Sequence, residues 1–390
     1  MGDVQRSFER ATGIGGAERG REFKLPRRDW ILLPLIGLTT MAILLGSTEL
    51  IARRMFPELK STLGNCLIEN DPATGVRGVP NSVCSEEGFE IGLVEYRFNG
   101  CGHRAGMECG PKATGTYRIA MVGTSTAFGT HLSREKTLAA LLPAELSRQA
   151  GQKVELYNEA LTWETPHSLA LRFNEVLAAG PDMILWILTP WDILNGSVVL
   201  PATAPPDAGF LPTARRRLKA SRTGVMLRYL VYKDPSSTVR LALLGTGGPE
   251  FLKAKPSTEW QRRLHEFDGY AAEIQDRARQ AGIPLVVVFM PERAQAAMIS
   301  MGQWPAGFDP YKLDGDLRSM IVGHGGTYIE ILPEFRSIPD PETYYFQVDG
   351  HPNARGHAWL SALLARRLIS GAFYALRIDL QPKAAQEPGR

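Results

Sequence analysis

The chain has few cysteines, little net charge and almost no ionisable residues in one long segment near its N-terminus. Its 390 residues carry 44 lysines and arginines against 41 aspartates and glutamates, giving a net charge of +3. No basic run is interleaved with aromatic residues, so no nucleic-acid partner is expected. No Cys-x-x-Cys pair is present, which makes a zinc site a weak hypothesis. The length is sufficient for one large domain or two ordinary ones.

Phosphate-binding and metal motifs are also lacking. Gly245-Thr-Gly-Gly248 has neither the strand–helix context nor the lysine of a phosphate-binding loop, and is interpreted as a loop. His351 and His357 are six residues apart, a poor spacing for metal ligands, and His357 is expected to cap or pack against the last helix. His103, His131 and His167 have no visible partners in the sequence. No cofactor and no metal site are therefore predicted.

Charge is nearly absent from residues 30–52, WILLPLIGLTTMAILLGSTELIA, where Glu49 is the sole ionisable residue. About twenty apolar residues suffice to cross a bilayer. Residues 1–29 carry many arginines and few positive residues follow residue 52, so the positive-inside rule predicts a cytoplasmic tail followed by one transmembrane helix. The chain is thus expected to be a single-pass protein of the cytoplasmic or inner membrane, with its main domain periplasmic or extracellular.

Three other interpretations of this segment stay open. Arg27-Arg28 loosely resembles the start of a twin-arginine export signal, and a cleaved signal peptide has similar flanks. A buried helix of a soluble protein is the third alternative, which the length and apolarity disfavour. No small-x-small cleavage site follows the apolar run cleanly, which favours an uncleaved anchor.

All the cysteines lie within a stretch of 44 residues beyond the apolar segment: Cys66, Cys84, Cys101 and Cys109. An even number of clustered cysteines on the expected outer side of a membrane predicts two disulfides in an oxidising compartment. Three connectivities are open, and four unpaired thiols are the alternative. Residues 53–115 are accordingly predicted to form an irregular, cysteine-containing neck with one strand at 93–98.

Strand-like and helical patterns alternate from residue 116 to residue 375. Strands are expected at 117–122, 153–158, 182–188, 283–290 and 327–331. Helices are expected at 134–149 capped by Ser133, from Thr165-Pro166 to Gly180, from the capping box at Thr258 to Gly282, from Asp309-Pro310, and at 354–370. This order predicts an α/β domain with a mainly parallel sheet and helices on both faces.

Residues 196–256 interrupt the alternation and are predicted to be an insertion. A basic stretch at 214–222 precedes an apolar helix at 225–231. This helix either rests on a membrane surface or over the active-site cleft, or packs on the domain with a solvated polar face. Residues 376–390 are expected to form a polar tail.

A serine and a distant Asp-x-His pair suggest nucleophilic chemistry. Ser125 lies in the glycine-flanked turn Gly123-Thr-Ser-Thr-Ala-Phe-Gly129, directly after the first expected strand of the sheet. Parallel α/β sheets bind their ligands beyond the carboxyl ends of the strands. A hydroxyl becomes a useful nucleophile when a neighbouring base removes its proton. Ser125 is therefore the candidate nucleophile, His351 the candidate base and Asp349 the residue that would orient the imidazole.

With these residues in place, the chain from about residue 93 to 370 resembles the SGNH, or GDSL-like, hydrolases, in particular membrane-anchored bacterial members. The first motif block is represented by Gly123-Thr124-Ser125, in which Thr replaces the usual Asp, and its lead-in by Phe98-Asn-Gly-Cys-Gly-His-Arg104. The last block is Asp349-Gly-His351-Pro-Asn353. The resemblance implies a flavodoxin-like parallel sheet and esterase or acyltransferase activity.

The middle blocks of the family supply the oxyanion hole. The second block is represented by Asn158-Glu-Ala160 and the third by Thr189-Pro-Trp191-Asp192. The resemblance therefore implies an oxyanion hole formed by Ser125, Ala160 and Trp191, with Trp191 at the position of the usual asparagine. Losing one such donor costs about two to three orders of magnitude in rate. Asn158, Glu164 and Asn195 are the candidates for a substitute donor.

Two functions of different classes follow. The first is an extracytoplasmic serine esterase or O-acyltransferase acting on acyl esters, of which O-acetyl groups on a cell-surface polysaccharide are the substrate that the resemblance implies. The second is a catalytically degraded domain that serves as a scaffold or accessory subunit of a membrane complex. The Ser–His–Asp set favours the first, whereas Trp191 and Thr124 favour the second.

Overall fold

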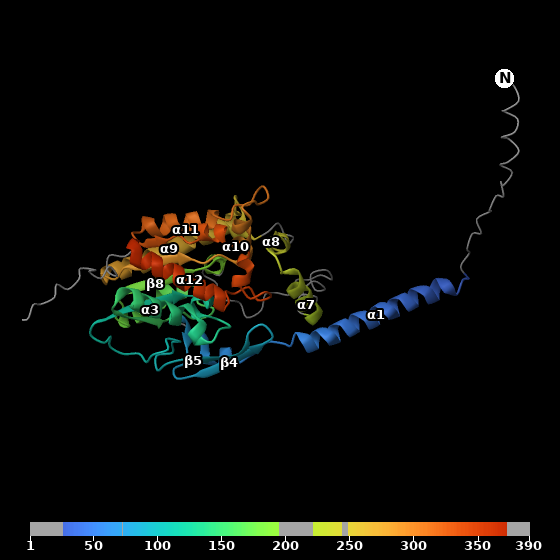
Figure 1. Cartoon of the computed structure of the whole chain (residues 1–390), viewed down its shortest axis with the longest axis horizontal. Coiled ribbons are helices and arrows are strands. Elements are labelled where there is room, and N and C mark those ends of the chain that lie inside the picture. Colours follow the sequence, from blue (N-terminus) through green and yellow to red (C-terminus); the bar gives the residue numbers. More distant parts are fainter. Residues whose placement is uncertain (1–25, 72, 195–220, 244–248, 373–390) are drawn as a thin grey trace, which may run out of the picture. The chain divides into compact units, whose positions relative to one another are not determined.

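The computed structural model of the protein describes residues 26–71, 73–194, 221–243 and 249–372. The chain divides into two compact units, residues 1–51 and 52–390. Helix α1 (Asp29–Met55) provides most of the described part of the first unit (Figure 1). It is long and apolar enough to cross a membrane. A signal sequence near the N-terminus has the same length and composition, so anchoring and orientation stay predictions.

A five-stranded parallel sheet forms the centre of the second unit, as the sequence predicts. Its order is β10-β9-β8-β6-β7, and its strands are β6 (Thr116–Gly123), β7 (Lys153–Asn158), β8 (Met183–Leu188), β9 (Leu285–Phe289) and β10 (Thr327–Ile329). Every residue of β6, β8 and β9 is buried, because helices cover both faces of the sheet. This burial explains why β8 and β9 are continuous apolar runs in the sequence.

Helices pack on the two faces of this sheet in two groups. Helix α3 (Leu138–Ala150) packs with α12 (Ala354–Arg367), and α4 (Pro166–Ala178) packs with α9 (Thr258–Gln280). Figure 1 shows α9 and α11 (Lys312–Gly323) above strand β8 of this sheet and α3 below it. The prediction of an α/β domain with helices on both faces is confirmed.

The neck is more regular than the sequence indicates. It contains two small antiparallel sheets, β1-β4-β5 and β2-β3. Their strands are β1 (Lys60–Ser61), β2 (Leu67–Asp71), β3 (Gly75–Gly78), β4 (Val83–Gly88) and β5 (Gly92–Arg97). The prediction of an irregular segment with one strand was wrong, because strands of two to six residues are too short to show a clear alternation. The expected strand at 93–98 is one arm of the β4–β5 hairpin.

The cysteines of the neck form two local pairs. Cys66 is bonded to Cys84, which lies on β4, and Cys101 is bonded to Cys109. The expectation of two disulfides is therefore met, with a connectivity that the sequence left open. The first disulfide joins the β4–β5 hairpin to the single helical turn Leu63–Cys66 at the start of the neck.

Several element boundaries differ from those expected. Thr137, and not Ser133, precedes α3, because the single turn Arg134–Lys136 comes first. Ser257, and not Thr258, caps α9, since its Oγ accepts a hydrogen bond from the N–H of Trp260 at 3.3 Å. Helix α11 starts at Lys312 rather than at Asp309-Pro310. The capping of α4 by Thr165 is confirmed, with Pro166 at the first helical position.

Some elements were missed or lie partly outside the described residues. Helix α10 (Arg293–Met301) was not expected. In the insertion, the helix expected at 225–231 is found as α7 (Arg222–Val231), whereas α8 (Pro235–Leu243) was not expected. The glycine cluster 245–248, most of the basic stretch 214–222 and the two terminal tails lie outside the described residues. Further single turns are found at Glu250–Leu252, Leu332–Ser337 and Pro341–Tyr344, and α12 continues as a π-helical turn, Leu368–Ala372.

Candidate active site

Ser125 lies at the point where the strand order of the sheet reverses. It is the first residue of the short helix α2 (Ser125–Phe128), directly after β6, which pairs with β7 on one side and β8 on the other. Crevices form at such switch points. The preceding Gly123 has a φ of +137°, and a Cβ there would lie 2.4 Å from the carbonyl oxygen of Ile187. Only glycine therefore allows this tight passage from strand to helix.

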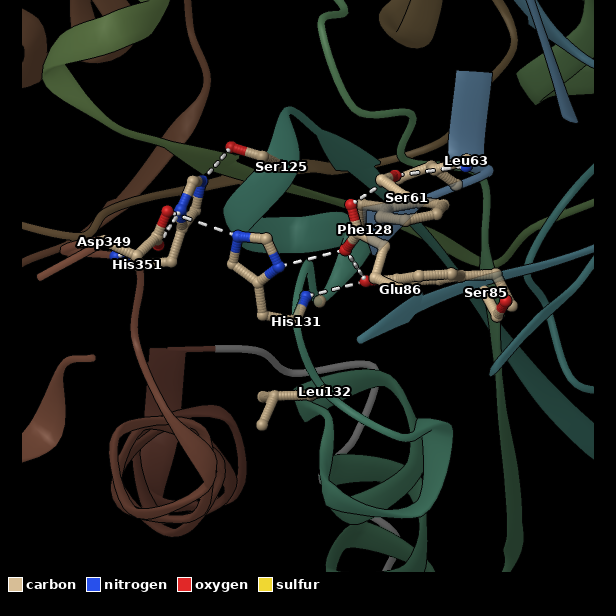
Figure 2. A network of polar contacts seen from close by, with 12 residues as sticks. Ser61, Leu63, Ser85, Glu86, Ser125, Phe128, His131, Leu132, Asp349 and His351 are labelled. Atoms are coloured by element: carbon tan, nitrogen blue, oxygen red, sulfur yellow. Dashed lines mark hydrogen bonds and ion pairs between the residues drawn. The ribbon is translucent and has the colours of Figure 1, made fainter. Parts of the chain in front are cut away.

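A hydrogen-bonded chain joins the three residues predicted to act together. His351 Nε2 lies 2.8 Å from Ser125 Oγ, and His351 Nδ1 lies 2.5 Å from Asp349 Oδ1 (Figure 2). The same Oδ1 accepts a hydrogen bond from the backbone N–H of His351 at 3.0 Å. The structure thus brings Ser125 together with Asp349 and His351, which follow it by more than two hundred residues in the sequence. The three side chains lie in the order that a nucleophile, its base and an orienting carboxylate require.

The loop that carries Asp349 and His351 is held by its own backbone and by one arginine. The N–H of Phe346 donates to the carbonyl of His351 at 2.8 Å, and Gly350, with a φ of +95°, allows the turn between them. Arg293, at the start of α10, donates to the carbonyl of Phe346 at 3.1 Å and to that of Gln347. These contacts fix the position of the imidazole relative to Ser125.

A second histidine lies behind Asp349, and the sequence did not reveal its partners. His131 Nε2 lies 3.2 Å from Asp349 Oδ2, and His131 Nδ1 lies 2.9 Å from Glu86 Oε2 on strand β4 (Figure 2). The backbone N–H of His131 donates to the hydroxyl of Tyr96 on strand β5 at 2.9 Å. The expectation that His131 has no visible partner is therefore corrected.

The charges of Glu86, His131 and Asp349 stabilise one another. Burial favours the neutral form of His131, but its hydrogen bonds to Asp349 and Glu86 outweigh burial and raise its pKa to about 9. Burial opposes ionisation of Asp349, yet hydrogen bonds from His131 and His351 hold its pKa well below the usual range. The pKa of Glu86 is likewise lowered against the effect of burial by hydrogen bonds from His131 and Tyr96. At neutral pH, Glu86 and Asp349 are thus carboxylates, and the His131 imidazolium lies between them.

His131, Asp349 and His351 also offer three potential ligand atoms that all lie within 4.8 Å of one another. The ring nitrogens of the two histidines are, however, all engaged by protein groups: Glu86, Asp349 and Ser125. The arrangement therefore has the form of a hydrogen-bonded chain. A cation would have to break at least two of its bonds to be coordinated.

Two of the residues considered as oxyanion donors, Ala160 and Asn158, form hydrogen bonds within the protein. The N–H of Ala160 donates to Asn158 Oδ1 at 3.1 Å, and the amide of Asn158 donates to the carbonyl of Ala127 at 3.3 Å. The Asn158 amide thus uses one of its two N–H donors on the backbone of α2. Glu164 is fully buried and forms a bidentate pair with Arg172. Asn195 lies outside the described residues.

Trp191 lies beside the imidazole rather than in the core. It belongs to the short helix α5 (Pro190–Leu194), is 48% exposed, and lines a cavity of about 90 Å³ together with Thr126 and His351. Burial raises the pKa of the neighbouring Glu292, partly offset by the charge of His351 and a hydrogen bond from Trp191. The predicted donor role of Ala160 and Trp191 remains a prediction.

The lead-in motif of the sequence packs against the segment that follows Ser125. Arg104 is 2% exposed and donates to the carbonyls of Phe128, Gly129 and Leu132 at 3.0, 2.9 and 2.5 Å. Its guanidinium also lies over the ring of Tyr96, 4.6 Å from the centroid. Arg104 therefore joins the neck to the helix and loop that begin at Ser125.

The remaining histidines have structural surroundings. His357 Nδ1 accepts a hydrogen bond from the N–H of Leu138, and burial lowers its pKa to about 3, so the expected packing role at the last helix is confirmed. Burial also lowers the pKa of His103 to about 3, and its ring contacts Tyr157. His167 packs against Tyr270.

No family model and no curated protein matches the chain. It resembles solved structures of SGNH-family hydrolases. AlinE4, an SGNH-hydrolase family esterase, is 14% identical over 66% of this chain and 97% of its own, with a TM-score of 0.36. The acetyl xylan esterase AlAXEase is 12% identical over 65% and 100%, with a TM-score of 0.38. A lipase/acylhydrolase from Enterococcus faecalis is 13% identical over 65% and 95%, with a TM-score of 0.35. These low identities and TM-scores give no information on the activity or substrate of the chain.

Proposed function

We propose that the protein is a serine esterase or O-acyltransferase in which Ser125 is the nucleophile, His351 the general base and Asp349 the orienting carboxylate. One observation carries this proposal: His351 bridges Ser125 Oγ and Asp349 Oδ1 at 2.8 and 2.5 Å. These bonds form where the strand order reverses, at the carboxyl end of β6. A turn serine with a structural role alone needs no imidazole aligned by a carboxylate.

The geometry supports a two-step acyl transfer. His351 Nε2 accepts the proton of Ser125 Oγ as the oxygen attacks the ester carbonyl carbon, while Asp349 stabilises the imidazolium through Nδ1. The imidazolium then returns the proton to the departing alcohol oxygen, which leaves an acyl-Ser125 ester. Water, or the hydroxyl of an acceptor, attacks that ester in the second step with its proton passing to His351. The choice of acceptor separates the esterase from the acyltransferase.

The proposed oxyanion donors are the N–H of Ser125 at the start of α2, together with Trp191 and Ala160. The N–H of Ala160 would have to leave Asn158 Oδ1, and the single indole N–H of Trp191 would have to leave Glu292, to take part. Tightening of such contacts in a substrate complex is common. The cavity of about 90 Å³ beside His351 suits a short acyl group, which supports acetyl esters as the substrate class. The proposed substrate is a cell-surface polysaccharide that carries these esters. The proposed location of the domain is extracytoplasmic, with helix α1 as a membrane anchor and the N-terminus in the cytoplasm.

A catalytically degraded scaffold is the second candidate. The engagement of Ala160 by Asn158 and the replacement of the usual asparagine by Trp191 favour it, because together they leave few donors for an oxyanion. Such a domain would serve as an accessory subunit of a membrane complex. It would keep the Ser–His–Asp geometry without turnover.

Labelling by a fluorophosphonate probe distinguishes these candidates. The full-length protein in detergent is expected to be labelled, and labelling is expected to vanish in Ser125→Ala but to persist in the matched control Ser133→Ala. Hydrolysis of an acetyl aryl ester, with and without a polysaccharide acceptor, then separates esterase from transferase. Absence of both labelling and turnover in the folded wild type would refute the enzyme and favour the scaffold.

A further inference from the structure

His131 and the hairpin of the neck contact the proposed triad from behind, and neither is part of the Ser–His–Asp set. We infer that His131 is a positioning residue for the proposed reaction: held by Glu86 of the neck, it fixes the carboxylate of Asp349 in the orientation that aligns His351 with Ser125. This inference rests on the proposed function. It assigns to the neck a direct part in the geometry of the site.

The carboxylate of Asp349 is held at both of its oxygens. Oδ1 lies 2.5 Å from His351 Nδ1, whereas Oδ2 lies 3.2 Å from His131 Nε2. Rotation of the carboxylate about its Cβ–Cγ bond would therefore break both contacts. The side chain of Asp349 is 33% exposed, so water competes for its oxygens. The protonated His131 holds Oδ2, so Oδ1 stays oriented toward His351.

His131 itself is rigidly placed. Its ring is 9% exposed and lies at right angles to that of His351, with centroids 5.5 Å apart. Its φ is +66°, in the left-handed region that a non-glycine residue adopts at a cost of about 1 to 3 kcal/mol. Such backbone strain persists only where surrounding contacts over-determine the conformation. Here the N–H bond to Tyr96 and the two carboxylates at the ring supply those contacts.

Glu86 is built to hold an imidazolium. Its Oε2 accepts hydrogen bonds from the hydroxyl of Tyr96 at 2.5 Å and from His131 Nδ1 at 2.9 Å, and its Oε1 accepts one from Ser61 at 2.8 Å. Glu86 is 5% exposed, which makes the loss of any one partner costly. Figure 2 shows the resulting series of polar contacts from Ser61 through Glu86 and His131 to Ser125.

The same hairpin reaches the catalytic loop a second time. Glu90, in the turn between β4 and β5, accepts hydrogen bonds from the N–H groups of Val348 and Asp349 at 2.8 and 3.1 Å. One carboxylate of the hairpin thus orients the side chain of Asp349 through His131, and another holds its backbone. Two independent contacts to a single residue are expected of an element that positions it.

His131 is surrounded by both acidic and basic groups. Glu86 and Tyr96 face it from the hairpin, and Asp349 and His351 face it from the catalytic loop. With Glu90, Arg222 and Arg228, His131 lines an adjoining cavity of about 320 Å³. The two ring contacts to carboxylates dominate and keep His131 protonated up to a pH of about 9. Loss of that proton at higher pH leaves one of the two carboxylates without its donor.

The test compares His131→Gln, which keeps one amide donor without charge, with His131→Ala in the full-length protein. His324→Gln is the matched control, because His324 also pairs with a carboxylate, Asp268, at 2.7 Å. We expect kcat for an acetyl aryl ester to fall about tenfold in His131→Gln and about 100-fold in His131→Ala, with KM within about twofold of wild type. His324→Gln should match wild type.

The pH dependence separates positioning from a merely structural role. Wild-type kcat/KM should decline as the pH rises past about 9, and this alkaline limb should be absent from His131→Gln. Equal rates and identical pH profiles for wild type and His131→Gln, with both variants folded by circular dichroism, overturn the inference while leaving the proposed function intact. A folded wild type that neither labels nor hydrolyses refutes the proposed function itself.

Discussion

The substitution Arg104→Ala tests whether the neck stabilises the segment that carries Ser125. Arg104 donates to three carbonyls that follow Ser125 in the sequence and is almost completely buried. Hydrogen bonds from a charged donor contribute about 1.5 to 3 kcal/mol each, and the desolvation of the guanidinium offsets part of their sum. We therefore expect a loss of about 4 kcal/mol in the free energy of unfolding, a large part of a typical total.

Thermal unfolding of the full-length protein in detergent, followed by circular dichroism, measures this loss. A change of about 4 kcal/mol corresponds to a decrease in Tm of about 10 °C for a domain of this size. Arg104→Lys should lie between, because one ammonium cannot reach all three carbonyls. Arg148→Ala is the control, since Arg148 is exposed and pairs with its helical neighbour Glu145. A Tm for Arg104→Ala within about 2 °C of wild type would refute the reasoning.

Three further predictions concern the site. Asp349→Asn should lower kcat by about 10⁴-fold and slow the fluorophosphonate labelling of Ser125 in parallel, because an amide cannot stabilise the imidazolium. Gly123→Ala should prevent soluble expression of folded protein, since its Cβ would lie 2.4 Å from the carbonyl oxygen of Ile187. The pKa of His131 is raised from 6.5 to about 9, so its contribution to stability is complete below pH 6.5 and is lost as the pH rises to about 9. Urea unfolding at pH 6 and pH 9.5 should therefore show a pH-dependent difference between wild type and His131→Gln of up to about 3 kcal/mol.

The α/β domain could be predicted from the sequence because its strands are buried on both faces. Continuous runs such as Met183–Leu188 and Leu285–Phe289 have no polar face, and glycine or proline marks where they end. The neck gave no such signal. Residues of β4 alternate only partly between exposed and buried positions, and its inward-facing Glu86 is charged because it pairs with His131. A buried carboxylate on a strand contradicts the hydrophobic pattern by which strands are recognised.

The residues of the candidate site likewise differ in whether the sequence reveals them. Ser125, Asp349 and His351 lie in short motifs whose glycines and spacing the chemistry requires, so the sequence indicated them. His131 has its partners 45 and 218 residues away, on a hairpin and on a loop, and no local spacing encodes that meeting. Its one local signal is conformational: a positive φ at a residue that is not glycine, which a sequence does not display. A residue that acts by holding another acquires its role only when the neck and the domain fold against each other, and that is why only the structure reveals it.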